Sequence, residues 1–286
     1  RILQNFEDAL IETDAEKQKA LLTIVVVGGG PTGVEVSGTL AEMKKFILPK
    51  DYPELDFSKM NIYLVEAGSR LLSGMTEKSS AQAAKYLEHL GVHVLCNAQV
   101  GDYDGERVII GNDMKIAANT LVWAAGVTGT KTEGLNPEIY VRGNRIKVNS
   151  FNQVEGFADI YALGDYAYMT EKKYPNGHPQ VATPAIQQAK LLANNLKRQQ
   201  QGKPMKPYTY FNRGSMATVG RNLAVVELPF IKFYGFFAWL TWMFVHLMAI
   251  VGVKNRVLVF INWFWSYVTY DQSLRLIIKP FVKKEE

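Results

Sequence analysis

A glycine-rich turn between two apolar segments constrains the fold of this 286-residue chain more than any other feature. The apolar run LLTIVVV (residues 21–27) is followed directly by Gly28, Gly30 and Gly33. The turn that they form leads into residues 32–46, where small and apolar residues recur at helical spacing. An unbroken run rich in β-branched residues is typical of a strand buried on both faces of a parallel sheet. The order of strand, G-x-G-x-x-G and helix is what the dinucleotide-binding fingerprint requires. The sequence therefore predicts an α/β fold with a doubly wound, Rossmann-like domain.

Each glycine of this turn has a mechanical role. The first permits a tight turn, the second lets the backbone approach a pyrophosphate, and the third lets helix and strand pack closely. The N-terminus of the helix offers free N–H groups and the positive end of its dipole. The residues predicted from this turn and its surroundings to bind the nucleotide are Gly28, Gly30, Pro31, Thr32, Gly33, Glu35 and Glu66.

Glu66 ends the next predicted strand, where a carboxylate can accept both hydroxyls of an adenosine ribose and repel a 2′-phosphate. This favours NADH over NADPH, although the nearby Arg70 acts in the other direction. The alternative is a glycine turn beside a surface glutamate. Glu35, in the first turn of the helix, also has two interpretations: stabilisation by the helix dipole, worth about 0.3 to 1 kcal/mol, or contact with the nicotinamide carboxamide.

The α/β order continues to about residue 130 and then ends. Spacing and flanking glycines or prolines indicate the elements. The first group comprises an amphipathic helix within residues 1–22, a loop at 47–59, a strand at 61–67, a helix at 79–90, a strand at 92–100, a hairpin within 101–115 and a strand at 119–126. The second group comprises short strands at 146–148 and 160–163, a helix at 183–201 and a tight turn or hairpin at 214–228.

The composition excludes several classes of protein. With 48% hydrophobic residues the chain can bury a sizeable core, so disorder is excluded. The single cysteine, Cys96, cannot form an internal disulfide, a CxxC pair or a thiolate metal site by itself. We therefore expect a reducing compartment and no metal. A formal charge of +5 would suit anionic lipid or nucleic acid but specifies neither.

The C-terminal part has the composition of a membrane-contacting segment. Residues 233–253 contain no Asp, Glu, Lys or Arg, and about 20 apolar residues can cross a bilayer as a helix. Four of the five tryptophans lie at residues 239–265, and tryptophan prefers the headgroup boundary, so helices lying in the interface are equally allowed. Lys254, Arg256 and the basic tail at 277–286 suit anionic lipid. The alternatives are a core hairpin or a homodimer interface.

Four motifs in a fixed order, GGGPTGVE, VEAG, WAAGV and YALGDYA, resemble flavoproteins in which a nicotinamide domain is inserted into a flavin domain. The resemblance implies that Ala125 and Gly126, in WAAGV, lead back into the flavin domain. It also implies that Gly164 and Asp165 lie at the ribityl chain of FAD. An aspartate after a strand and a glycine can accept hydroxyl hydrogens at the carboxyl edge of a sheet, and an ordinary turn aspartate is the alternative.

Within these flavoproteins, residues 179–196 and the aromatic C-terminus look like type II NADH dehydrogenase. That family has an AQxAxQ motif beside the isoalloxazine ring, and here its first glutamine is replaced by Thr183. Without the resemblance, the two adjacent glutamines would be solvated helix surface. The resemblance assigns Ala182, Thr183 and Pro184 to the flavin and Thr183, Ile186, Gln187 and Gln188 to the quinone.

The resemblance implies hydride transfer from NADH to FAD and electron transfer to a quinone without proton pumping. Glu35 and Gln187 are the catalytic candidates, with Glu35 as proton relay. The expected division is a helix of the preceding FAD half (1–20), the NADH domain (21–130), the second FAD part (131–229) and membrane helices (230–286), with the first FAD-binding segment absent. The expected location is the cytoplasmic face of the inner (cell) membrane, peripheral or monotopic, with no nucleic-acid partner.

Two rival functions remain open. A soluble disulfide reductase of the same superfamily would carry its redox cysteines in the upstream segment, but it would need a polar dimerisation domain at the aromatic C-terminus. A membrane-tethered, non-catalytic NADH-binding fragment follows if the protein begins at Arg1. Sulfide:quinone oxidoreductase is disfavoured because Cys96 lies in the nicotinamide domain.

Overall fold

The apolar run before the glycine turn forms the central part of a parallel sheet. The computed structural model describes residues 1–111 and 113–269. Strand β1 (Ile24–Val27) lies between β2 (Ile62–Val65) and β7 (Thr120–Trp123), and β3 (Val92–Leu95) pairs with the other edge of β2. All four residues of β1 are buried. The predicted α/β fold with a parallel sheet is therefore confirmed.

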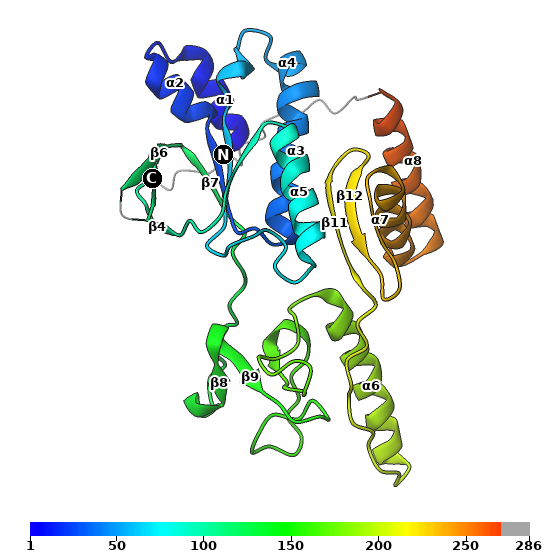
Figure 1. Ribbon diagram of the computed structural model, residues 1–286. Helices are drawn as coiled ribbons and strands as arrows, with labels where there is room; N and C mark the ends of the chain where they lie inside the picture. The colour runs from blue at the N-terminus through cyan, green and yellow to red at the C-terminus, as the bar shows by residue number, and fades with distance from the viewer. Residues whose placement is uncertain (112, 270–286) are drawn as a thin grey trace, which may run out of the picture. The chain divides into compact units, whose positions relative to one another are not determined.

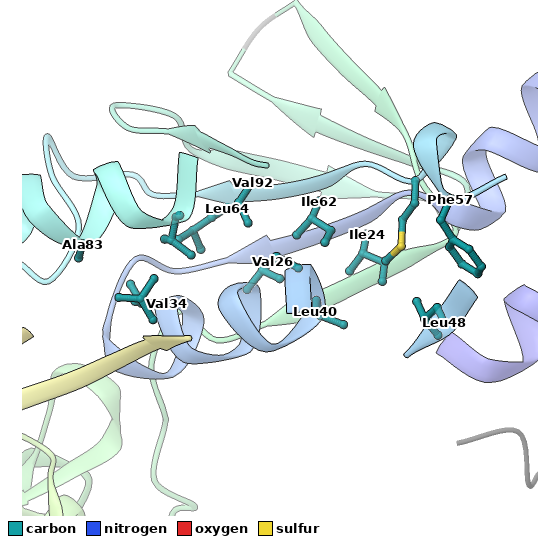
Figure 2. Close-up of a cluster of buried hydrophobic side chains, with 14 of the residues drawn as sticks. Ile24, Val26, Val34, Leu40, Leu48, Phe57, Ile62, Leu64, Ala83 and Val92 are labelled. Atoms are coloured by element: carbon teal, nitrogen blue, oxygen red, sulfur yellow. The ribbon is translucent and has the colours of Figure 1, made fainter. Parts of the chain in front are cut away.

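The two faces of this sheet are covered differently. Ile24 and Val26 point to the face that carries α3 (Pro31–Phe46), as Figure 2 shows with Val34 and Leu40 of that helix. Helices α1 (Ile2–Ile11), α2 (Ala15–Leu22) and α5 (Glu77–His89) add to the same core. The other face packs on an antiparallel sheet of β4 (Val100–Tyr103), β5 (Arg107–Ile110) and β6 (Met114–Ala117). A sheet therefore occupies the face where double winding would place helices.

Three predicted boundaries in this region were wrong. The helix expected within residues 1–22 is two helices, because Asp14 caps α2 by accepting hydrogen bonds from the Glu16 and Lys17 amides at 2.9 and 3.3 Å. The strand expected at 92–100 ends at Leu95, since Asn97 has φ of 54° and turns the chain. The expected loop at 47–59 contains α4 (Leu48–Asp51) and the 3₁₀ turn η1 (Phe57–Lys59).

Residues 1–125 and 214–269, apart from residue 112, belong to the first compact unit, which also holds the glycine turn. Strands β11 (Ser215–Gly220), β12 (Leu223–Glu227) and β13 (Lys232–Tyr234) form an antiparallel sheet beside α3 and α5 (Figure 1). This confirms the hairpin predicted at 214–228. A Cβ at Gly38 of α3 would overlap the Val219 carbonyl oxygen, so glycine is needed for this approach. The contact therefore fixes β11 directly on α3.

Glu227 at the end of β12 attaches this sheet to α5. Its carboxylate accepts hydrogen bonds from the Thr76 amide at 2.9 Å, from the Ser79 hydroxyl at 2.5 Å and from the Thr76 hydroxyl. Thr76 is the N-cap residue of α5, so Glu227 satisfies one amide that the helix leaves without a partner. A residue of the β11–β13 sheet thus completes the N-terminus of α5.

Residues 126–213 form a second compact unit. It contains a small sheet of β8 (Tyr140–Val141), β9 (Arg145–Lys147) and β10 (Ala167–Tyr168), the 3₁₀ turns η2 (Pro137–Ile139), η3 (Arg142–Asn144) and η4 (Gly164–Tyr166), and the long helix α6 (Ala182–Gln200). The helix expected at 183–201 is confirmed. The strand expected at 160–163 was wrong, because only the isolated bridge of Tyr161 with Gln153 forms there.

The aromatic C-terminal part forms helices α7 (Phe236–Ala249) and α8 (Val253–Thr269). Across residues 1–111 and 113–269, no helix combines the length and apolar character that crossing a membrane requires. The surfaces of α7 and α8 nevertheless carry many large, exposed apolar side chains, including Phe237, Phe244, Phe264 and Trp265. Tyr270 and the basic tail lie outside the described residues.

Candidate functional site

The glycine turn has the geometry that its sequence predicts. A Cβ at Gly28 would lie 2.7 Å from the Ala124 carbonyl group, and one at Gly33 would overlap the Gly28 carbonyl oxygen. Gly30 has nothing within 4 Å of an added Cβ and caps α3, which begins at Pro31. The first and third glycines therefore permit close packing, while the second leaves exposed backbone at a helix N-terminus.

Glu66 follows β2 directly and reaches back to this turn. Its carboxylate accepts hydrogen bonds from the Gly29 amide at 2.5 Å and from the Gly68 amide at 2.6 Å. The Arg70 guanidinium donates to the carbonyls of Met75 at 2.8 Å and Ser73 at 2.9 Å. The turn and the carboxylate predicted to bind one nucleotide are thus in direct contact.

A cavity of about 300 Å³ lies between α3, the β11–β12 hairpin and helices α7 and α8. Its walls include the aromatic side chains of Phe46, Trp239, Trp242, Trp263 and Tyr267, and they also carry two carboxyl groups. The residues that decide its chemistry are Glu35, Thr39, Glu42, Trp239, Trp242 and Tyr267. This cavity is entirely within the first unit.

Glu35 lies half-buried in this cavity, on α3. Its Oε1 accepts a hydrogen bond from the Thr218 amide at 3.3 Å. Burial raises the pKa of the carboxyl group, and this outweighs the lowering by the Thr218 amide, by the charge of His246 and by Trp242. Glu35 therefore retains its proton to a higher pH than a solvated glutamate, while its contact with nicotinamide stays a prediction.

Glu42 is a second acidic residue of the cavity and was not predicted. It is half-buried and accepts a hydrogen bond from the Arg221 amide in the β11–β12 turn. Burial raises its pKa more than the Arg221 amide and the Arg221 charge lower it. The signal in the sequence was the spacing of Glu35, Thr39 and Glu42, which places polar residues at i, i+4 and i+7 on one helix face.

The residues predicted for the flavin lie together in the second unit. Asp165 in η4 is exposed, and its carbonyl oxygen accepts a hydrogen bond from the Gln180 amide at 3.1 Å. A Cβ at Gly164 would lie 2.9 Å from the Ala185 Cβ, so η4 touches the first turn of α6. Ala182, Thr183 and Pro184 form that turn.

The predicted quinone glutamines hold loops in this unit. The Gln188 side chain is 1% exposed, and its Oε1 accepts from the Gly164 amide at 2.7 Å. Gln187 donates to the Phe211 carbonyl at 2.8 Å and accepts from the Phe211 amide at 3.1 Å. Thr183 and Ile186 are more accessible, with Ile186 53% exposed. Ala125 and Gly126 mark the boundary between the two units.

Comparisons with known proteins give consistent results. A family model described as "Pyridine nucleotide-disulphide oxidoreductase" matches residues 3–189, and one described as "NDH2 C-terminal domain" matches residues 212–269. Type II NADH:quinone oxidoreductase Ndh of Mycobacterium tuberculosis is 33% identical over 281 residues, covering 94% of this chain and 59% of the relative. An internal alternative NAD(P)H-ubiquinone oxidoreductase A1 of Arabidopsis thaliana mitochondria is 30% identical, with coverage of 88% and 52%.

Among solved structures, NDH2 from Plasmodium falciparum in complex with NADH is similar with a TM-score of 0.83 at 21% identity. The similarity covers 94% of this chain and 70% of that one. Such identity supports the fold alone. The chain spans between half and three fifths of the length of the two curated relatives.

Proposed function

Since the chain belongs to the pyridine nucleotide-disulphide oxidoreductase family, and within it to the type II NADH dehydrogenases, we propose that it transfers electrons from NADH through FAD to a membrane quinone without pumping protons. The observation that carries this proposal is one unit that holds both a nucleotide turn bonded to Glu66 and an aromatic cavity containing Glu35. The first unit would hold the NADH domain and residues 126–213 would serve as part of the FAD domain. The FAD part expected from the sequence ran to residue 229, but β11 and β12 pack on α3 and α5 of the first unit. The segment from residue 230 would contact the membrane.

The turn would hold the nucleotide through its backbone. The open backbone at Gly30 and the α3 N-terminus would bind the pyrophosphate. A carboxylate has about four lone-pair sites, so Glu66 can keep its two amide donors and still accept ribose hydroxyls. Arg70 is engaged with two carbonyls and is not directed at a 2′-phosphate, which favours NADH.

The second unit offers groups that fit FAD. The exposed Asp165 carboxylate can accept ribityl hydroxyls. In the first turn of α6 beside it, Ala182 and Thr183 have backbone N–H groups suited to a polar ring edge, while Pro184 has none. The chain would also turn around FAD at Ala125, Gly126 and Gly164. When bound, FAD supplies the redox chemistry between nicotinamide and quinone. In this assignment the chain's own residues bind and orient the cofactor.

The cavity would receive the quinone ring. Its aromatic walls suit a flat apolar ring, and the raised pKa of Glu35 keeps a proton on a carboxyl group beside it. Glu35 would donate that proton to a quinone oxygen. Thr183 and Ile186 stay quinone candidates of the second unit, where Gln187 and Gln188 would act by holding the Phe211 and Gly164 loops.

Helices α7 and α8 would attach the protein to a lipid surface. Large apolar side chains such as Phe244 and Trp265 are 63% and 62% exposed, which is costly in water and favourable in the interface of a bilayer. Lys254 and Arg256 at the junction of the two helices would contact anionic headgroups on the cytoplasmic face. Burial of the same surface in a homodimer is the competing use.

An absorption spectrum tests the proposed function. We expect the detergent-purified chain to carry flavin bands that bleach on addition of NADH and recover on addition of ubiquinone-1. Recovery with a disulfide substrate in place of the quinone would favour the disulfide-reductase alternative. A colourless protein that still binds NADH would restrict this chain to nucleotide binding and assign catalysis to a longer parent.

A further inference from the structure

Three side chains of α3 form a polar line along one wall of the cavity. Glu35, Thr39 and Glu42 all line it, at positions i, i+4 and i+7 of the helix. With a rise of about 1.5 Å per residue, the two glutamates are roughly 10 Å apart along the axis. That separation is too large for a direct hydrogen bond. Thr39 lies between them, and its hydroxyl donates to the backbone carbonyl of Glu35 at 2.8 Å.

Glu42 is held at the far end of this line by the β11–β12 turn. A Cβ at Gly220 would lie 3.0 Å from Glu42 Oε1, which shows how closely the turn approaches the carboxyl group. The turn is itself fixed to α8, because the Arg221 guanidinium stacks on the Tyr267 ring at 4.0 Å. The Tyr267 hydroxyl also donates to Asn222 Oδ1 at 3.3 Å. The Glu42 carboxyl group is therefore fixed in the wall of the cavity.

The proton requirement of the proposed reaction gives this second acid a role. Reduction of a quinone to a quinol takes two electrons, which NADH supplies, and two protons, one for each oxygen. The hydrogen that NADH gives up returns to solvent as a proton, so one proton is consumed overall for each NADH. A single carboxyl group can deliver only one of the two protons before it is recharged from solvent.

We propose that Glu42 is the second proton-holding residue of the cavity and serves one quinone oxygen while Glu35 serves the other. This inference rests on the proposed function. Desolvation of both carboxyl groups supports it, because a proton donor works best when its pKa lies near the working pH. Both acids are recharged from solvent, Glu42 beside Arg221 and Glu35 beside His246.

Glu42 could instead serve only to hold the turn, and one substitution separates the two roles. Glu42→Gln keeps an oxygen that accepts from the Arg221 amide but removes the acidic proton. Glu42→Asp keeps the acid on a shorter side chain. Glu88→Gln on α5 is the matched control, because it removes one exposed carboxylate outside the cavity. All variants are compared in the full-length, FAD-loaded protein.

The measurement is the rate of flavin reoxidation by ubiquinone-1 as a function of pH, with flavin reduction by NADH followed separately. For the wild type we expect reoxidation to slow as the pH rises through the raised pKa values of the two acids, since a deprotonated acid cannot donate. The charged and titratable groups that face Glu42 are Arg221 and Tyr267, and Glu35 lies farther along the cavity, where the charge of His246 acts on it.

We expect Glu42→Gln to lower the reoxidation rate at pH 7 by about 100-fold, the lower end of the usual effect of a general acid, and to change its pH profile. Glu42→Asp should recover part of the rate, and reduction by NADH should be unchanged. Infrared spectra recorded against pH give a readout without turnover: the carbonyl band of protonated carboxyl groups should weaken in Glu42→Gln but not in Glu88→Gln.

Two results would overturn the proposal in different ways. If ubiquinone-1 reoxidises the wild type while Glu42→Gln keeps the wild-type rate and pH profile, Glu42 only holds the turn and the proposed function stands. If ubiquinone-1 fails to reoxidise the NADH-reduced wild type, the proposed function itself is wrong and the Glu42 proposal falls with it.

Discussion

Glu35 and Glu66 are both held by backbone amides but in different surroundings. Glu66 accepts from the Gly29 amide in the glycine turn and from the Gly68 amide just after β2, whereas Glu35 has one weak donor and aromatic neighbours. The position of Glu66 could be predicted because strand ends of a parallel sheet meet at one edge. The surroundings of Glu35 could not, because its donor Thr218 is 183 residues away in the sequence. Long-range packing decides such contacts, and local patterns do not record it.

Glu66 gives a prediction about nucleotide choice. Glu66→Ala should weaken NADH binding about 10- to 100-fold, because hydrogen bonds to a charged acceptor are each worth roughly 1.5 to 3 kcal/mol. NADPH should be affected much less, since its 2′-phosphate loses a repelling charge. Fluorescence titration of both nucleotides measures this. A substitution that merely disorders the turn, where Gly29 and Gly68 bond to Glu66, would instead weaken both nucleotides alike.

At the scale of elements, local signals predicted strands and helices well and their packing poorly. The hairpin at 214–228 follows from its glycines, and the helix at 182–200 from its spacing. The close approach of the Val219 carbonyl to Gly38 could not be predicted from the sequence. A glycine among other small helix residues does not indicate which segment packs against it. The packing of the β4–β6 sheet on the face of the parallel sheet opposite α3 was also not predicted. The short strands that follow β3 in the sequence do not indicate the surface on which they pack.

The contact of β12 with α5 predicts a pH-dependent stability. Although burial acts to raise it, hydrogen bonds from Ser79 and Thr76 hold the pKa of Glu227 below its usual value. A depressed folded-state pKa means that this stabilisation is present above the unfolded-state pKa and is lost as the pH falls through the folded-state value. Glu227→Gln should therefore destabilise the protein by about 1 to 2 kcal/mol at pH 7, and by less in acid.

Urea denaturation at pH 7 and at pH 4 measures this difference. Glu54→Gln is the control, because Glu54 is exposed in the segment between α4 and η1. An equal loss for Glu227→Gln at both pH values would assign the effect to packing of β12 on α5 and would contradict the role of the charged carboxylate.

On the scale of the whole molecule, sequence and structure agree that the surface of α7 and α8 is unusually rich in exposed aromatic and apolar side chains. The aromatic composition predicted contact with lipid but left open whether the helices cross or lie flat, and the family resemblance favoured a monotopic anchor. Helix α7 has 14 residues, about 21 Å, which is shorter than the roughly 30 Å hydrocarbon core. α7 ends at Ala249, and Gly252, with φ of 89°, lies in the short turn before α8. The position of this turn could not be read from an uncharged stretch alone.

The exposed surface of α7 and α8 supports a prediction about vesicle binding. Burying an aromatic side chain contributes about 1.5 to 3 kcal/mol, so Phe244→Asp combined with Phe264→Asp should lower binding to vesicles of phosphatidylcholine and phosphatidylserine by at least 100-fold. Ile11→Asp is the matched control, since Ile11 is 82% exposed at the end of α1. Co-sedimentation at increasing salt separates the apolar contribution from that of Lys254 and Arg256, because only the charged part is screened.

The same double variant distinguishes a membrane from a second copy of the chain. If α7 and α8 bind lipid, the wild-type and control proteins should sediment with vesicles and the double variant should remain in solution. Unchanged vesicle binding by the double variant would remove α7 and α8 from the contact. If the wild type ignores vesicles but forms a dimer in sedimentation velocity that the double variant cannot form, the surface is an interface between copies.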